Sequence, residues 1–154
     1  MVGGAAMALA YDAARVTRDV DAVFKPHGIV LEEARKVADD LGLPYWWLNE
    51  QASVYISGKE DASRRRVFDH PGLRVMAASP AHVFAMKARA ARTRDIDDLR
   101  LLADIIGVNS ADAALRVCAD FTRTNLFLPD RQLYSMSFSI DLDKTRSSLA
   151  PIGV

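Results

Sequence analysis

The chain has 154 residues, half of them hydrophobic, and its 20 lysine and arginine residues balance its 20 aspartate and glutamate residues. This length and composition fit one globular domain with a core of its own. The balanced charge excludes a general attraction to nucleic acids or acidic membranes, so such a contact would need a local patch. Because the chain lacks both an apolar run of about 20 residues and a basic leader, we expect a soluble, cytoplasmic protein with no membrane partner.

The first half of the chain predicts helices and strands separated by turn-forming residues. Helices are indicated by apolar residues at the helical period, and strands by alternation or by β-branched residues. In chain order we expect a strand end or remnant at Met1 and Val2, a helix opened by Gly3 and Gly4, a strand over residues 15–24, a helix over 29–41 ended by Gly42, and a loop over 43–50.

The second half predicts two more strands and then helices. The strands are expected over residues 53–58 and 72–79, on either side of a polar connection, and the helices over 80–92, 95–106 and 110–120. Ser79 is a suitable N-cap and Pro80 a suitable first residue for the first of these helices. We therefore expect an α/β (α+β) domain over residues 1–120, with a small mixed sheet flanked by helices. A weakly patterned extension follows over 121–154, in which residues 134–144 alternate like a strand.

Two aspartates, Asp19 and Asp21, stand one residue apart in the first predicted strand. Side chains alternate along a strand, so both carboxylates and the Thr17 side chain share a face, with the aspartate Cα atoms about 6.5 to 7 Å apart. Like charges at that spacing repel unless a cation or a proton lies between them. The pair predicts a divalent metal site; the alternative is an exposed sheet edge with solvated charges.

The double glycine followed by Asp-x-Asp in GGAAMALAYDAARVTRDVD resembles the motif of the polymerase-beta-type nucleotidyltransferase superfamily. The later stretch SPAHVFAMKARAARTRDIDDLRLLADIIGV is similar to the lysine-bearing helix and the Arg-Asp segment of its AbiEii-like branch, which contains toxins of bacterial toxin–antitoxin pairs. The resemblance runs from Val2 to about Val108. It implies a nucleotidyltransferase fold, an NTP substrate and Mg²⁺ (or Mn²⁺) as the metal.

The resemblance also implies roles for individual residues. Backbone N–H groups at Gly3 and Gly4 would cradle the triphosphate at the start of the helix. Asp19 and Asp21 would be the catalytic metal ligands, since Mg²⁺ prefers carboxylates, waters and phosphate oxygens. Lys87 would contact the nucleotide phosphates.

An acid of the Arg-Asp segment, Asp98, is implied for the catalytic region. If the helix after Lys87 were continuous, a rotation of 100° per residue would align Lys87 with Arg94 and Asp98. The alternative is that Asp95 caps a new helix, with Asp98 in its first turn. A third metal ligand would come from Asp69, Asp95, Asp98 or water.

Several further residues are open to two interpretations each. Arg15 and Thr17 contact phosphate or neutralise the aspartates, and we place both in the nucleotide site. Trp46 and Trp47 stack on a base or pack in a corner. The three arginines at residues 64–66 bind RNA phosphates or belong to a solvated loop.

Two functions follow for this chain. The first is a Mg²⁺-dependent nucleotidyltransferase that moves a nucleoside monophosphate from an NTP to an RNA end, with tRNA as the expected acceptor, or to a protein side chain. As a toxin, such an enzyme would have a cognate antitoxin protein as a partner. The second is a catalytically degenerate domain of the same fold that binds nucleotide or a partner protein.

Overall fold

The computed structural model describes residues 1–12, 14–56 and 60–121, which form the expected α/β (α+β) fold. This described part contains five α-helices and two sheets of two strands each, and none of its helices is long and apolar enough to cross a bilayer. The strand expected over residues 134–144 lies outside the described residues. The elements in chain order are α1 (Gly3–Ala6), the π-helical turn η1 (Met7–Tyr11), β1 (Val20–Asp21), α2 (His27–Leu41), β2 (Leu48–Asn49), the 3₁₀ helix η2 (Gln51–Tyr55), β3 (Arg65–His70), β4 (Leu73–Ala77), α3 (Pro80–Ala90), the 3₁₀ helix η3 (Thr93–Asp95), α4 (Ile96–Ile106) and α5 (Ala111–Asp120).

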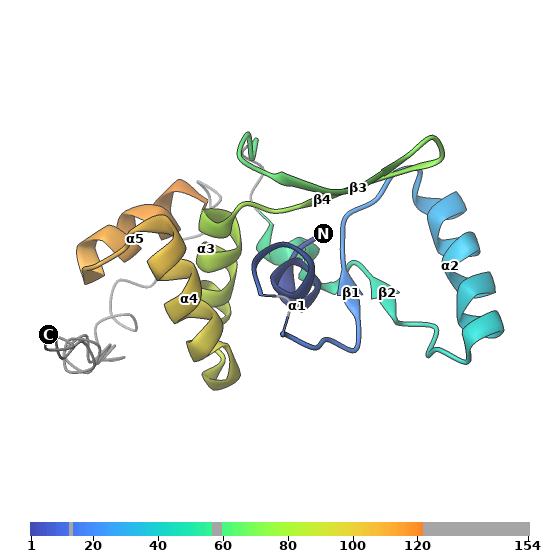
Figure 1. Ribbon diagram of the computed structural model, residues 1–154, viewed down its shortest axis with the longest axis horizontal. Helices are drawn as coiled ribbons and strands as arrows, with labels where there is room; N and C mark the ends of the chain where they lie inside the picture. Colours follow the sequence, from blue (N-terminus) through green and yellow to red (C-terminus); the bar gives the residue numbers. More distant parts are fainter. Residues whose placement is uncertain (13, 57–59, 122–154) are drawn as a thin grey trace, which may run out of the picture. The chain divides into compact units, whose positions relative to one another are not determined.

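The first two residues connect the two small sheets. β1 and β2 pair in parallel, and β3 and β4 form an antiparallel hairpin. The Val2 N–H donates to the Asp21 carbonyl oxygen at 2.8 Å, and the Ala78 N–H donates to the Met1 carbonyl oxygen at 2.9 Å. Met1 and Val2 therefore hold a strand position between β1 and the end of β4 (Figure 1), in agreement with the strand end expected there.

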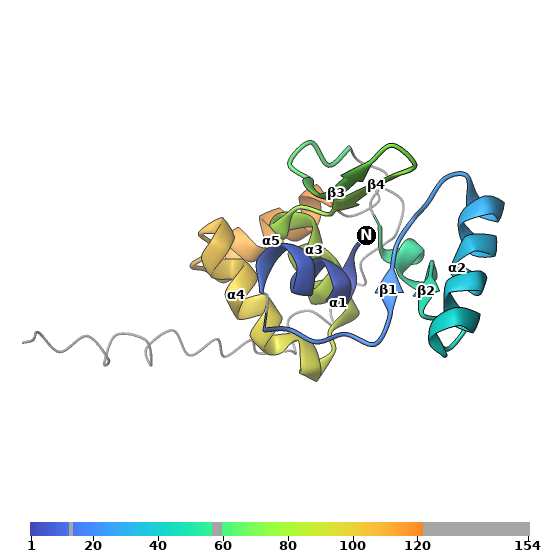
Figure 2. The ribbon, with the colours of Figure 1, turned by 45° about the vertical axis from the view of Figure 1, so that its right-hand side comes forward.

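The core lies where α1 and η1 pack against α3 and α4. Met7, Val83 and Leu102 are fully buried there. Figures 1 and 2 show α1 with α3 and α4 on one side and β1 on the other. Because α1 consists of glycine and alanine, its backbone can approach both neighbours closely. The buried core residues are Val2, Ala6, Met7, Ala77, Ala78, Val83, Phe84, Met86, Leu99, Leu102 and Ala103.

The helices begin and end close to where the sequence predicts. The Ser79 side chain accepts a hydrogen bond from the His82 N–H, and Pro80 follows as the first residue of α3. α2 ends at Gly42, whose φ of 64° is in the left-handed region that glycine adopts without strain. Local signals set these ends, since capping depends on the nearest few residues.

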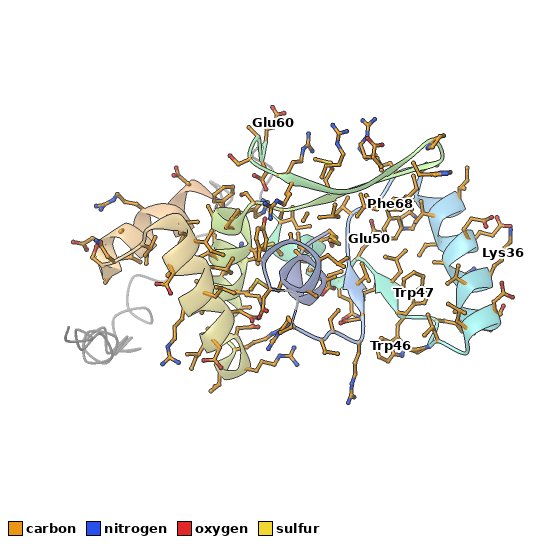
Figure 3. The ribbon with its side chains drawn as sticks, viewed as in Figure 1. Lys36, Trp46, Trp47, Glu50, Glu60 and Phe68 are labelled. Carbon is orange, nitrogen blue, oxygen red and sulfur yellow. The ribbon has the colours of Figure 1, made fainter. Side chains whose placement is uncertain are left out.

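α2 is attached to the rest of the domain through a tryptophan. The Trp47 Nε1–H donates to the Ala34 carbonyl oxygen at 2.9 Å, and Figure 3 shows Trp47 between β2 and α2. Of the residues of α2, Ala34 and Ala38 are buried. Trp47 therefore packs in a corner, whereas Trp46 is exposed.

Four sequence predictions about strands and the segments between them are wrong. The strand expected over residues 15–24 is reduced to Val20–Asp21, because only this pair of residues has a partner strand, β2. Within the predicted loop 43–50, Leu48–Asn49 forms that partner. In the described part of the strand expected over 53–58, residues 53–55 belong instead to η2, whose backbone bonds are local, with the Ser53 N–H donating to the Glu50 carbonyl oxygen. The polar connection over 59–72 contains a strand, β3, because the turn at Pro71-Gly72 returns the chain onto it.

Candidate functional site

The double glycine lies directly against the segment that carries the two aspartates. Gly3 has a φ of 62°, and a Cβ atom there would lie 3.0 Å from Asp21 Oδ2. A Cβ atom at Gly4 would lie 2.8 Å from Thr17 Oγ1. Both contacts are closer than side chains tolerate without movement, so only glycine gives this approach of backbone to carboxylate and hydroxyl. The structure thus brings Gly3, Gly4, Thr17 and Asp21 together.

The charge of Asp19 acts on Asp21, although Asp19 precedes the strand. The Thr17 hydroxyl lies 3.0 Å from the Asp19 carbonyl oxygen and 3.3 Å from Asp19 Oδ1, which fixes the turn before β1. Burial raises the pKa of Asp21, and the negative charge of Asp19 raises it further. A hydrogen bond from the Ala52 backbone and the charges of Arg92 and Lys87 act in the opposite direction. Two half-buried carboxylates therefore share one negative site.

Lys87 is the centre of a buried ion network. Its ammonium lies 2.6 Å from Asp95 Oδ1 and 2.8 Å from Asp98 Oδ2, and all three residues are buried. Arg15 Nη2 lies 3.2 Å from the same Asp98 oxygen. Asp98 therefore connects the lysine of α3 to the arginine that precedes β1.

Of the two arrangements expected after Lys87, the structure has the second, in which a new helix, α4, begins after Asp95 and has Asp98 in its first turn. α3 ends at Ala90, and Ala91 adopts a left-handed φ of 49°, so the helix is not continuous. The chain turns through η3 and returns as α4, which places Asp98 beside Lys87 by tertiary packing. Asp95 precedes α4 but makes no side-chain cap hydrogen bond; it accepts from Lys87 instead.

Asp69, one of the candidates for a third metal ligand, lies apart from the aspartate pair. Asp69 is on the hairpin, where it pairs with Arg66 at 2.7 Å and Arg74 at 3.4 Å, so it does not join Asp19 and Asp21. Arg92, whose charge acts on Asp21, was missed by sequence reasoning. It follows directly after the end of α3, so the only local signal was its place in a basic run.

One donor near the ion network has no acceptor. The Nε–H of Arg15 is buried, and no described residue accepts a hydrogen bond from it. A buried donor without a partner costs about 1–3 kcal/mol. Arg15 therefore retains a hydrogen-bonding group that an anionic ligand would satisfy.

A second buried polar cluster secures the start of α3. Asp61 Oδ2 accepts from the Ser79 N–H at 2.8 Å and lies 3.2 Å from His82 Nδ1. The Tyr11 hydroxyl donates to the Ala78 carbonyl oxygen. Burial, with a contribution from Asp61, raises the pKa of Tyr11 to about 12. These bonds tie η1 to the β4–α3 junction and require no ligand.

The donor set around Asp19 and Asp21 fits Mg²⁺ better than a metal held entirely by protein. Within residues 1–12, 14–56 and 60–121, no group of three or more His, Cys, Asp or Glu side chains is placed to hold an ion. Mg²⁺ needs only one or two carboxylates when waters and substrate phosphates complete its shell.

No family model matches the sequence, and comparisons with curated proteins and with solved structures find no match either. The functional argument therefore depends on the geometry of the site itself.

Proposed function

We propose that the chain is a Mg²⁺-dependent nucleotidyltransferase that transfers a nucleoside monophosphate from an NTP to an acceptor. The observation that carries the proposal is the contact between the glycine turn and the acid pair, with Gly3 Cα and Asp21 Oδ2 too close to admit a Cβ atom. Phosphate binding by backbone and metal binding by carboxylate must occur side by side for this reaction. The proposed acceptor is an RNA end, and tRNA is the first to test.

The acid pair supports a bound cation for electrostatic reasons. Burial and the charge of Asp19 disfavour ionised Asp21, and a divalent ion between the carboxylates would relieve both effects. Mg²⁺ (or Mn²⁺), when bound, would neutralise charge on the phosphates and align the acceptor hydroxyl with the α-phosphate. Backbone N–H groups at Gly3 and Gly4 would bind that phosphate, and Arg15 would donate its Nε–H, which no described residue accepts, to a phosphate oxygen.

Lys87 has a more constrained role than a free phosphate ligand. An ammonium has three N–H donors, and Asp95 and Asp98 accept two of them. One donor is left for a phosphate oxygen. Asp98 then acts through Lys87 and Arg15, holding both cations, rather than as a catalytic acid.

The test is a transfer assay with labelled NTPs, Mg²⁺ and bulk tRNA. Asp19→Ala and Asp21→Ala should each reduce label transfer to the level of the metal-free reaction. Asp97→Ala is the matched control, because Asp97 is an exposed aspartate of α4 paired only with Arg100 among the described residues, and it should transfer like the wild type. Transfer that persists in both Asp19→Ala and Asp21→Ala would overturn the proposal.

The second candidate is a degenerate domain that binds nucleotide, or a partner protein, without catalysis. The observation that favours it is the pairing of Lys87 with two carboxylates, which reduces its positive charge toward a substrate. Thermal stabilisation by an NTP with Mg²⁺, without label transfer to tRNA or protein, would support this candidate over the enzyme. If the chain is the active nucleotidyltransferase and acts as a toxin, its proposed partner is a cognate antitoxin that blocks transfer.

A further inference from the structure

Residues 64–74, which we call the basic hairpin, carry a concentrated positive charge in a chain that is neutral as a whole. They contain four arginines and a single acid, Asp69. Arg66 and Arg74 both pair with that one carboxylate and remain largely exposed. Since exposed ion pairs contribute little, both guanidinium groups are available to a stronger anionic partner.

The pairing of the strands sorts the hairpin into two faces. Successive side chains alternate along a strand, and directly opposed residues share a face. On β4, Leu73, Val75 and Ala77 lie on one face, and their partners on β3 are His70, Phe68 and Arg65. The second face carries Arg66, Asp69 and Arg74. The basic hairpin thus has one charged face and one face that carries aromatic side chains.

The aromatic side chains are stacked and exposed. The rings of Phe68 and His70 lie 6.3 Å apart at 25°, and Phe68 is 49% exposed. Figure 3 shows Phe68 below the hairpin ribbon. Ala77, on the same face, is fully buried, so this face runs from the core out to an uncovered aromatic pair. The arginines of the charged face lie on the same two-stranded hairpin, so nucleic acid that passed around its edge would meet both stacking rings and guanidinium groups, the two contacts that hold single strands.

Hydrogen bonds connect the basic hairpin to the candidate site. Arg65 Nη1 donates to the Ala10 carbonyl oxygen at 2.6 Å, which fixes β3 to the helical segment opened by the double glycine. Met1 and Val2 lie between the end of β4 and β1, so those two strands are two strand spacings, about 10 Å, apart. A strand of RNA that continued from the aromatic pair past the end of β4 would bring its end toward β1 and Asp21.

We propose that the basic hairpin binds single-stranded RNA and presents it as the acceptor for the candidate site. RNA binding by the hairpin stands on its own observations, whereas the acceptor role rests on the proposed nucleotidyltransferase function. Phe68 and His70 would stack on bases, and Arg64, Arg66 and Arg74 would contact phosphates.

Binding is tested by fluorescence anisotropy with a labelled oligouridylate of about 12 nucleotides, within the usual site sizes of such proteins. Phe68→Ala and Phe68→Leu should each weaken binding about tenfold, because neither side chain stacks on a base. The double variant with Arg64→Ala and Arg74→Ala loses two phosphate contacts. The slope of its log affinity against log salt should therefore be smaller in magnitude by about 1.4. Circular dichroism verifies that each variant is folded.

Lys36→Ala and Arg100→Ala are matched controls, because both remove exposed cations from helices away from the hairpin, and they should bind RNA like the wild type. Equal binding by wild-type protein and the hairpin variants would overturn the inference, as would the absence of RNA binding by the wild type.

The outcomes also separate this inference from the proposed function. Hairpin-dependent RNA binding without any label transfer would refute the enzyme and leave the RNA site standing. Label transfer to RNA or protein that hairpin substitutions do not change would refute the hairpin's role and leave the enzyme standing.

Discussion

At the scale of single residues, Asp21 is where folding and the proposed function conflict. Burial and the charge of Asp19 raise its pKa above the ordinary value of 3.8. A raised pKa means that the folded state holds the proton more tightly than the unfolded state. The contribution of Asp21 to stability is thus present below about pH 3.8 and is lost as the pH rises through its folded pKa.

We therefore expect Asp21→Asn to increase the free energy of unfolding of the metal-free protein at pH 7, because the amide removes the charge but can still accept from the Ala52 N–H. Urea denaturation measures the difference, with Asp97→Asn as the exposed control. A decrease in stability for Asp21→Asn would contradict the electrostatic description of the site.

Gly4 gives a steric prediction at the same scale. An alanine Cβ atom at this position would lie 2.8 Å from Thr17 Oγ1, so Gly4→Ala should destabilise the fold by about 1–3 kcal/mol. Thr17→Ala in the same chain should recover part of that loss, since it removes the hydroxyl but leaves Cβ. Gly28→Ala is the control, because a Cβ atom there meets nothing within 4 Å. Thermal unfolding compares the three variants with the wild type; equal losses at Gly4 and Gly28 would show that the close approach is absent.

At the scale of elements, the α3–α4 pair depends on the buried Lys87 network. Replacing Lys87 with methionine would leave the buried Asp95 carboxylate without its cation and Asp98 with Arg15 alone, and we expect a loss of about 3–5 kcal/mol in stability. Lys36→Met removes an exposed lysine that pairs with Glu32 and Glu33 and should cost less than about 1 kcal/mol. Chemical denaturation measures both.

Adding Asp95→Asn and Asp98→Asn to Lys87→Met should restore much of the lost stability, because no buried charge is then unpaired except that of Arg15. Failure of the triple variant to recover would indicate that Lys87 stabilises the helices by packing alone. A loss of activity in Lys87→Met would also need this stability measurement before it could be attributed to catalysis.

The same elements show why the sequence predicted some parts of the site and not others. Gly3, Gly4, Asp19 and Asp21 are close in the chain and form one motif, whose resemblance to a known family implied a shared site. A continuous helix was one of two expectations for Lys87 and Asp98. They meet because the left-handed Ala91 ends α3 and α4 folds back, and such a packing contact has no period in the sequence.

At the scale of the whole molecule, the fold class, the helices and the strand β4 were predictable, and the other strands were not. Helix periodicity and caps are local, which is why α2, α3, α4 and α5 occur close to their predicted ranges. A strand depends on a distant partner. β1 and β2 are thus shorter than any pattern indicates, and the arginine-rich residues of β3 form a strand only because β4 pairs with them.

The account of the whole molecule depends on one metal and triphosphate site formed by the glycine turn and the acid pair. NMR spectra of the full chain with ATP and paramagnetic Mn²⁺ test it most directly, since Mn²⁺ accepts the same oxygen ligands as Mg²⁺. We predict that Mn²⁺ with ATP broadens the amide signals of Gly3, Gly4, Asp19 and Asp21 first, and that Asp21→Asn abolishes this broadening. Sharp signals at these four residues, or broadening that Asp21→Asn leaves unchanged, would contradict the account.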